Sequence, residues 1–271
     1  MTAVVNEFAK MRHLHLGVMC AVLALAVIGL TILTSVVAPD FADPQTRRWE
    51  QLLAGLSMGV PLATPLLLAV CASRLVDAEH QGNGWLLGQT SGLTPGALCR
   101  AKFVVLGVLV AAASTIAVFV PMLFGLAIGI PNQLPMGTWI GFWACSLVVS
   151  LTVLALHVVI AAKVENQLVG LGIGLIGTIL AVFASGLPTV ARHLTPWGYY
   201  SLSTAAEYAG GELTLQTPSY LSVAALGLAA GALFLGAAEG LAHARRDAVG
   251  RNQLARVLGQ RAQRADGVDD L

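Results

Sequence analysis

Long apolar stretches alternate with short polar segments along the whole chain. Six of these stretches carry few or no charged residues, and each is long enough to cross a hydrocarbon core of roughly 30 Å as a helix. They cover approximately residues 16–38, 52–73, 103–130, 138–162, 167–187 and 219–242. Because backbone polar groups must be satisfied within a bilayer, the pattern predicts an all-α integral membrane protein with six transmembrane helices.

The segment before the first span has an amphipathic pattern. Residues 1–15 have a helical period, with Phe8 and Met11 on one side and Glu7 and Lys10 on the other. This pattern predicts an N-terminal helix that lies flat at the inner membrane interface.

Two of the segments between the spans are long enough to contain secondary structure of their own. Residues 74–102 are charged at both ends and interrupted by glycines, but they retain apolar residues such as Trp85 and Leu86. They predict one or two short amphipathic helices at the cytoplasmic membrane surface, which either rest on the membrane or receive another protein. Residues 188–218 carry Trp197 and several tyrosines, which favour the opposite membrane interface.

The distribution of lysine and arginine predicts which side of the membrane each segment faces. Most of these residues share a side with the N-terminus and lie in segments 1–15, 74–102, 163–166 and the polar tail 243–271. The segments on the other side hold Arg47, Arg48 and Arg192. Both termini are therefore expected in the cytoplasm.

The composition agrees with a membrane protein, since 56% of the residues are hydrophobic and 11% are charged, whereas soluble domains carry about 25% charged residues. The net charge of +1 and the lack of a basic cluster with interleaved aromatic residues give no indication of nucleic-acid binding. The four cysteines show neither CxxC nor Cys/His spacing, so neither a zinc site nor a disulfide framework is indicated.

The sequence lacks two common motifs of enzymatic chemistry. GxxxxGK[ST] and HExxH are absent, so it shows no phosphate-binding loop or metal-binding helix of these kinds. Ionisable residues inside the spans are His157 and Glu239, both near inner ends. This scarcity argues against a carrier that relays protons through carboxylates within the membrane. We expect His157 to be hydrogen-bonded near the interface.

Two motifs lie on the inner side of the predicted spans. Before span one, Glu7, Lys10 and Arg12 form an E-x-x-K-x-R pattern. Between spans two and three, an acidic residue is followed by glycines on either side of an asparagine, by a Trp-Leu-Leu run and by an R-x-K pattern. The residues concerned are Glu79, Gly82, Gly84, Trp85, Leu86, Leu87, Arg100 and Lys102.

A third motif lies on the outer side, where Pro196, Trp197 and Tyr199 form a P-W-x-Y segment before the last span. Together with six spans and two cytoplasmic termini, these motifs resemble the permease subunit of a type-2 ABC exporter. Within that family, the chain is most similar to the permeases of lantibiotic-immunity and bacitracin-resistance transporters.

The resemblance implies a bacterial plasma-membrane protein with two kinds of partner: a cytoplasmic ABC ATPase subunit and a second permease chain, in a homodimer or heterodimer. ATP and Mg²⁺ would bind to the ATPase, and this chain would hold no cofactor, metal or catalytic residue. A coupling helix would dock on the ATPase through Asp77, Glu79, Gly82, Gly84, Trp85 and Leu86. The elbow helix would use Glu7, Lys10 and Arg12.

For the outer side, the resemblance implies that residues 188–218 form re-entrant helices, with Pro196, Trp197 and Tyr199 in an outer cap. Substrate would leave between spans two and five of the paired chains.

The sequence thus favours a permease that exports an amphipathic or hydrophobic compound, such as a peptide antibiotic, by means of a separate ATPase. Another cargo, namely a lipid-linked glycan, a drug or a metabolite, would fit the same mechanism. A membrane scaffold or sensor subunit without transport is the alternative of a different class, and an intramembrane enzyme would lack visible catalytic groups. If Glu79 couples the two subunits, Glu79→Lys is predicted to keep the fold and lose ATP-driven export.

Overall fold

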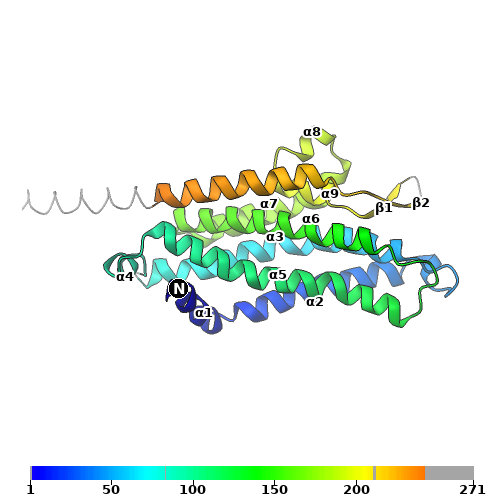
Figure 1. Ribbon diagram of the computed structural model, residues 1–271, viewed down its shortest axis with the longest axis horizontal. Coiled ribbons are helices and arrows are strands. Elements are labelled where there is room, and N and C mark those ends of the chain that lie inside the picture. The colour runs from blue at the N-terminus through cyan, green and yellow to red at the C-terminus, as the bar shows by residue number, and fades with distance from the viewer. Residues whose placement is uncertain (1, 83, 210–211, 242–271) are drawn as a thin grey trace, which may run out of the picture.

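The computed structural model describes residues 2–82, 84–209 and 212–241 (Figure 1). Within these residues, six helices are long and apolar enough to cross a membrane, which confirms the predicted all-α membrane fold. They are α2 (Leu16–Val36), α3 (Trp49–Gln81), α5 (Pro95–Ala127), α6 (Met136–Lys163), α7 (Gln167–Phe183) and the final helix, Tyr220–Leu241.

The long helices run side by side in an elongated bundle, and the short elements gather at its ends (Figure 1). The inner end, named after the predicted orientation, holds α1 (Thr2–His13) and α4 (Gly84–Thr90). The outer end holds η1 (Pro39–Phe41) and a hairpin of β1 (Ala206–Ala209) and β2 (Glu212–Leu215). The last helix ends at the same end as α1, as expected for an even number of spans.

Helices α3 and α5 extend much further inward than the predicted spans, 52–73 and 103–130. The helical period of α3 continues beyond Ser73, and Leu75, Val76 and Glu79 remain buried. Helix α5 begins early because Thr94 caps it, its hydroxyl accepting a hydrogen bond from the backbone N–H of Ala97 at 3.1 Å. The predicted loop 74–102 therefore shrinks to a short connection that contains α4.

The centre of the bundle is α3, which packs against α2, α6 and α7. Small residues allow close helix approach, since a Cβ added at Gly55 would lie 2.8 Å from the carbonyl oxygen of Thr31 on α2. At the outer end, the rings of Trp49 and Trp139 pack edge to face, with their centroids 6.3 Å apart. These contacts fix the helices around α3.

The segment between α7 and the final helix enters the bundle from its outer end. It contains η2 (Ala184–Gly186), α8 (Thr189–Arg192), η3 (Pro196–Gly198) and α9 (Tyr199–Leu202). The indole of Trp197 fills the space beside Gly177, where an added Cβ would overlap the ring. The hydroxyl of Tyr200 lies 3.2 Å from that of Ser150, near the middle of α6. Short helices thus insert among the long ones, whereas residues 206–209 and 212–215 of the same segment form the hairpin.

The hydrogen bond expected for His157 is not found among the described residues, so that prediction is wrong. Its side chain is buried, and neither ring nitrogen has a hydrogen-bond partner. The rings of His157 and Trp197 pack with centroids 6.2 Å apart. The inserted segment therefore covers the imidazole with an aromatic ring instead of a polar group.

Candidate functional site

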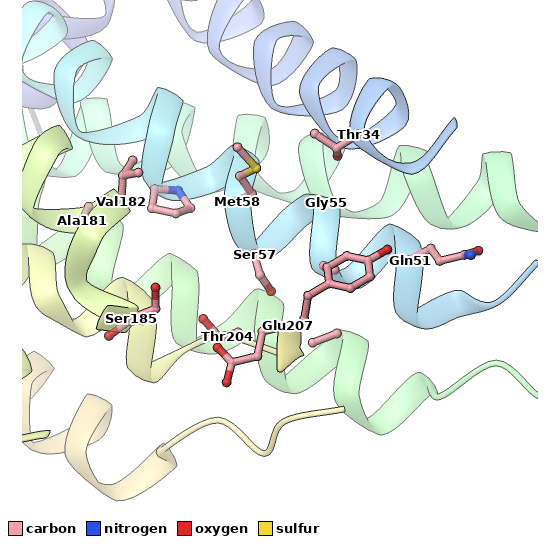
Figure 2. A pocket seen from close by; sticks show the side chains of 15 residues that line it. Thr34, Gln51, Gly55, Ser57, Met58, Ala181, Val182, Ser185, Thr204 and Glu207 are labelled. Atoms are coloured by element: carbon pink, nitrogen blue, oxygen red, sulfur yellow. The ribbon is translucent and has the colours of Figure 1, made fainter. Parts of the chain in front are cut away.

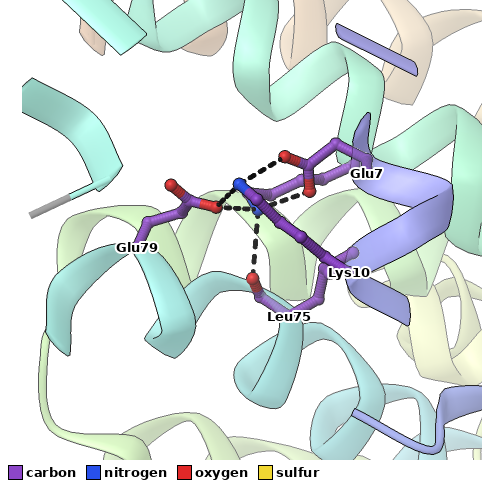
Figure 3. A network of polar contacts seen from close by, with 5 residues as sticks. Glu7, Lys10, Leu75 and Glu79 are labelled. Carbon is purple, nitrogen blue, oxygen red and sulfur yellow. Dashed lines mark hydrogen bonds and ion pairs between the residues drawn. The ribbon is translucent and has the colours of Figure 1, made fainter. Parts of the chain in front are cut away.

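Four charged side chains meet at the inner end of the bundle (Figure 3), beside Gly84 at the start of α4. Glu7 and Lys10 come from α1, Glu79 from the last turns of α3 and Lys102 from the early turns of α5. We call these four residues the charge cluster. Three helices that are distant in sequence thus contribute to one ionic site.

The contacts within the charge cluster are short. The ammonium of Lys102 lies 2.7 Å from Glu7 Oε2 and 2.8 Å from Glu79 Oε1, and it also donates to the carbonyl oxygen of Leu75 at 3.1 Å. The ammonium of Lys10 lies 2.9 Å from Glu7 Oε1 and 2.5 Å from Glu79 Oε1. Each carboxylate therefore binds both lysines, and all three protons of the Lys102 ammonium have an acceptor.

Burial makes this pairing essential to the inner end. Lys102 has 0% of its surface exposed, Glu7 1% and Glu79 2%. A charge removed from water is tolerated in a protein when it is paired and hydrogen-bonded. Two carboxylates balance two ammonium groups here, so the loss of any one of them leaves an uncompensated charge. The cluster therefore holds α1 and the inner ends of α3 and α5 in one arrangement.

Lys10 is the most exposed member of the cluster. Partial burial lowers its pKa, but hydrogen bonds to Glu79 and Glu7 and their negative charges outweigh this effect and raise the pKa above its ordinary value. The ammonium form is therefore maintained at neutral pH.

The coupling residues proposed from the sequence fall into different environments. Glu79 and Trp85 are buried, and the Trp85 ring lies 5.7 Å from that of His80 between centroids. Leu86 and Leu87 are 57% and 63% exposed. The face of α4 that is open to a partner therefore carries two leucines. Because Glu79 is buried against α1 and α5, any role it has in coupling acts through these helices.

The remaining inner residues lie around this site. Asp77 accepts a hydrogen bond from Gln81 on the next turn of α3. Gly84 lies so close to the Glu79 carboxylate that an added Cβ would overlap it, while Gly82 caps α3. Arg12 is exposed and lies outside the charge cluster.

Sequence reasoning named Lys102 as part of a motif and missed its role as the central cation. Two features of the sequence could have indicated the cluster. Positions i and i+3 of a helix lie on one face, which brings Glu7 and Lys10 together. The charged residues after span two and before span three face each other if both helices extend inward.

A cavity of about 510 Å³ lies beside the cluster, between α1, α4 and the inner ends of α3 and α5. Its walls combine the charged groups with small and apolar residues, including Asn6, His13, Gly88, Ser91, Leu93 and Leu98. The inner end thus offers a hollow next to an exposed leucine surface.

A second cavity of about 240 Å³, the outer pocket, opens between the outer halves of α3 and α7 (Figure 2). Residues from α9 to β1 close one side of it. Of the predicted outer cap, Trp197 packs deeper in the bundle, Tyr199 packs against the ring of His193, and Pro196 borders an apolar groove beside the final helix. The cap residues therefore support the inserted segment without lining the outer pocket.

Comparison with protein families provides the decisive observation. The family described as ABC-2 family transporter protein matches residues 3–181, from α1 to the outer part of α7. The chain belongs to the ABC-2 family. It is therefore a membrane component of an ABC transporter, and not the subunit that hydrolyses ATP. A search of curated proteins found no significant match.

The charge cluster and α4 both lie within the matched part of this ABC-2 chain. Among the described residues, no group of three or more His, Cys, Asp or Glu side chains is placed to hold a metal ion.

Proposed function

We propose that this chain is the permease subunit of an ATP-driven exporter in a bacterial plasma membrane. It moves an amphipathic or hydrophobic compound, such as a peptide antibiotic, out of the cytoplasm or the membrane. A separate ATPase binds ATP and Mg²⁺, and a second permease chain, identical or different, completes the pathway. The charge cluster beside the start of α4 is the observation that carries the proposal.

The charge cluster supplies a mechanical link between α4 and the membrane. Helices α3 and α5 are each 33 residues long, so each extends for about 50 Å at 1.5 Å per residue. Because α4 connects these helices and the cluster clamps them to α1, a force on α4 moves their inner ends as a unit. Helix α3 carries that movement to the outer pocket, where Gln51 and Ser57 form part of the wall.

The position and walls of the outer pocket fit a route for cargo. It lies between α3 and α7, which are spans two and five, and the resemblance implied that these two spans border the exit route of the paired chains. Its lining combines hydroxyl groups with apolar side chains, including Thr34, Ser185, Thr204, Met58, Ala181 and Val182. Such a surface suits an amphipathic compound better than a purely apolar one.

Exposed leucines on α4 support the proposed ATPase contact. A surface of this kind in an otherwise charged region marks a protein or membrane interaction site. The connection between α3 and α5 is also where the resemblance implied a coupling helix. We therefore assign Leu86 and Leu87 to the direct contact, and Glu79 to its support.

Co-purification tests this function. The full chain is isolated in mild detergent from membranes of its native host, and the eluate is assayed for a P-loop subunit and for ATP hydrolysis. We expect a bound ATPase, and we expect Leu86→Ser combined with Leu87→Ser to remove most of it. Leu194→Ser is the matched control, because Leu194 is 77% exposed but lies in the outer segment. A chain that elutes alone would favour a scaffold or sensor subunit.

A further inference from the structure

The outer pocket carries an unbalanced negative charge. Glu207 on β1 lines it, and none of its lining residues is a lysine, arginine or histidine. The described part of the chain provides no ion-pair partner for Glu207. Its Oε1 accepts a hydrogen bond from the side-chain amide of Gln216 at 3.2 Å, which leaves the charge of the carboxylate uncompensated.

Neutral polar groups of the pocket can assist this carboxylate in binding a cation. In Figure 2, the side chains of Glu207, Thr204 and Ser57 lie near one another on one side of the cavity. The Ser57 oxygen already accepts a hydrogen bond from the backbone N–H of Ala205 at 3.2 Å, so its position is fixed. A carboxylate with nearby hydroxyl oxygens provides the several acceptors that an ammonium group requires.

The pocket also has apolar walls. Met58, Ala181 and Val182 contribute aliphatic surface, and Tyr208 adds an aromatic ring. An aromatic face also attracts a cation electrostatically. The pocket thus offers acceptors for a positive charge and apolar surface for the rest of a ligand.

We infer that the outer pocket binds the ammonium end of a cationic, amphipathic cargo, with Glu207 as its counter-charge. This inference rests on the proposed export function, because it names the class of compound that uses the same route. The ammonium hydrogen-bonds to Glu207 and to hydroxyl oxygens, while the apolar part of the cargo contacts α3 and α7. Neutral and anionic compounds of similar shape gain less from the pocket.

Binding of a fluorescent pair of compounds tests the inference. The full chain is placed in nanodiscs of phosphatidylcholine, which is zwitterionic, and titrated with dansylcadaverine or with its neutral N-acetyl derivative. The ammonium probe should bind at least about fivefold more tightly than the neutral one, since a charge-assisted hydrogen bond stabilises more than a neutral bond. Glu207→Gln should remove this preference.

Glu212→Gln is the matched control, because Glu212 lies on β2 of the same hairpin, is exposed and does not line the pocket. It makes the same change in net charge, and it should bind both probes as the unmodified chain does. Equal binding of the two probes, no binding of either, or an unchanged preference in Glu207→Gln would overturn the inference. Since this assay contains no ATPase, a chain that binds the ammonium probe but never co-purifies with an ATPase would contradict the export function alone.

Discussion

The two ends of the bundle differ in whether their charged side chains are paired. At the inner end, Glu7, Glu79 and Lys102 are buried, and together with the partly exposed Lys10 they form ion pairs across α1, α3 and α5. At the outer end, Glu207 faces a pocket whose lining contributes no cation. Paired buried charges resist rearrangement, whereas an unbalanced carboxylate in an open pocket is available to a ligand. The comparison assigns force transmission to the inner end and cargo contact to the outer end.

The largest expected effect comes from reversing a buried charge. Glu79→Lys would place three ammonium groups around Glu7, so we expect it to lower the free energy of unfolding by more than about 5 kcal/mol. This differs from the expectation drawn from sequence, which was a retained fold. Unfolding in micelles of increasing dodecyl sulfate content measures the change, and Glu165→Lys is the control because the Glu165 side chain is 83% exposed at the same end. Equal stability of the two variants would contradict the role of the charge cluster.

Removal of the central cation should have the next largest effect. Lys102→Met leaves Glu7 and Glu79 with a single shared ammonium, from Lys10, and should destabilise the chain by about 3–5 kcal/mol. The same unfolding assay applies. Lys163→Met removes an exposed lysine at the end of α6 and should change stability by less than about 0.5 kcal/mol. Similar losses in both variants would mean that Lys102 acts as an ordinary surface charge.

A smaller effect is expected where the backbone approaches the cluster. Gly84→Ala introduces a Cβ that overlaps the Glu79 carboxylate, so we expect a loss of about 1–3 kcal/mol as the cluster shifts. Gly137→Ala is the control, because an added Cβ there meets no atom within 4 Å. Thermal unfolding in nanodiscs should separate the two variants, and an unchanged transition for Gly84→Ala would show that the carboxylate moves freely.

The smallest stability effect is expected at the outer pocket. Glu207→Lys makes the same residue change as Glu79→Lys, yet it should alter the free energy of unfolding by less than about 1 kcal/mol. Glu207 is only partly buried and forms no ion pair with the described residues. The dodecyl sulfate assay gives the value. A loss as large as that of Glu79→Lys would abolish the distinction between the two ends.

The sequence was most informative within the membrane. Continuous apolar runs predicted the six spans because the bilayer leaves few other conformations to such segments. It was least informative where charged residues are buried. Glu79 and Lys102 were assigned to a segment of short amphipathic helices at the membrane surface, whereas both lie in long helices, α3 and α5, where they are paired. The local sequence pattern predicts neither the burial of these two residues nor the packing of Trp197 on His157, since both depend on contacts between distant segments.

The outer hairpin was also missed. Its strands are four residues each and pair from Ala206 with Leu215 to Ala209 with Glu212. Strands this short give a weak alternating signal, and Gly210-Gly211 between them was the available turn indicator. As a result, sequence analysis did not identify Glu207, which requires the hairpin to reach the outer pocket.

The central claim is that the charge cluster transmits movement from α4 to the outer pocket. All four native cysteines are buried, so Leu215→Cys on β2 offers an exposed position for an environment-sensitive dye. With the ATPase bound in nanodiscs, Mg-ATP should change the dye signal in this labelled chain and in its Glu165→Gln variant, but not in its Glu79→Gln variant. An equal ATP response in Glu79→Gln, with the ATPase still bound, would contradict the claim.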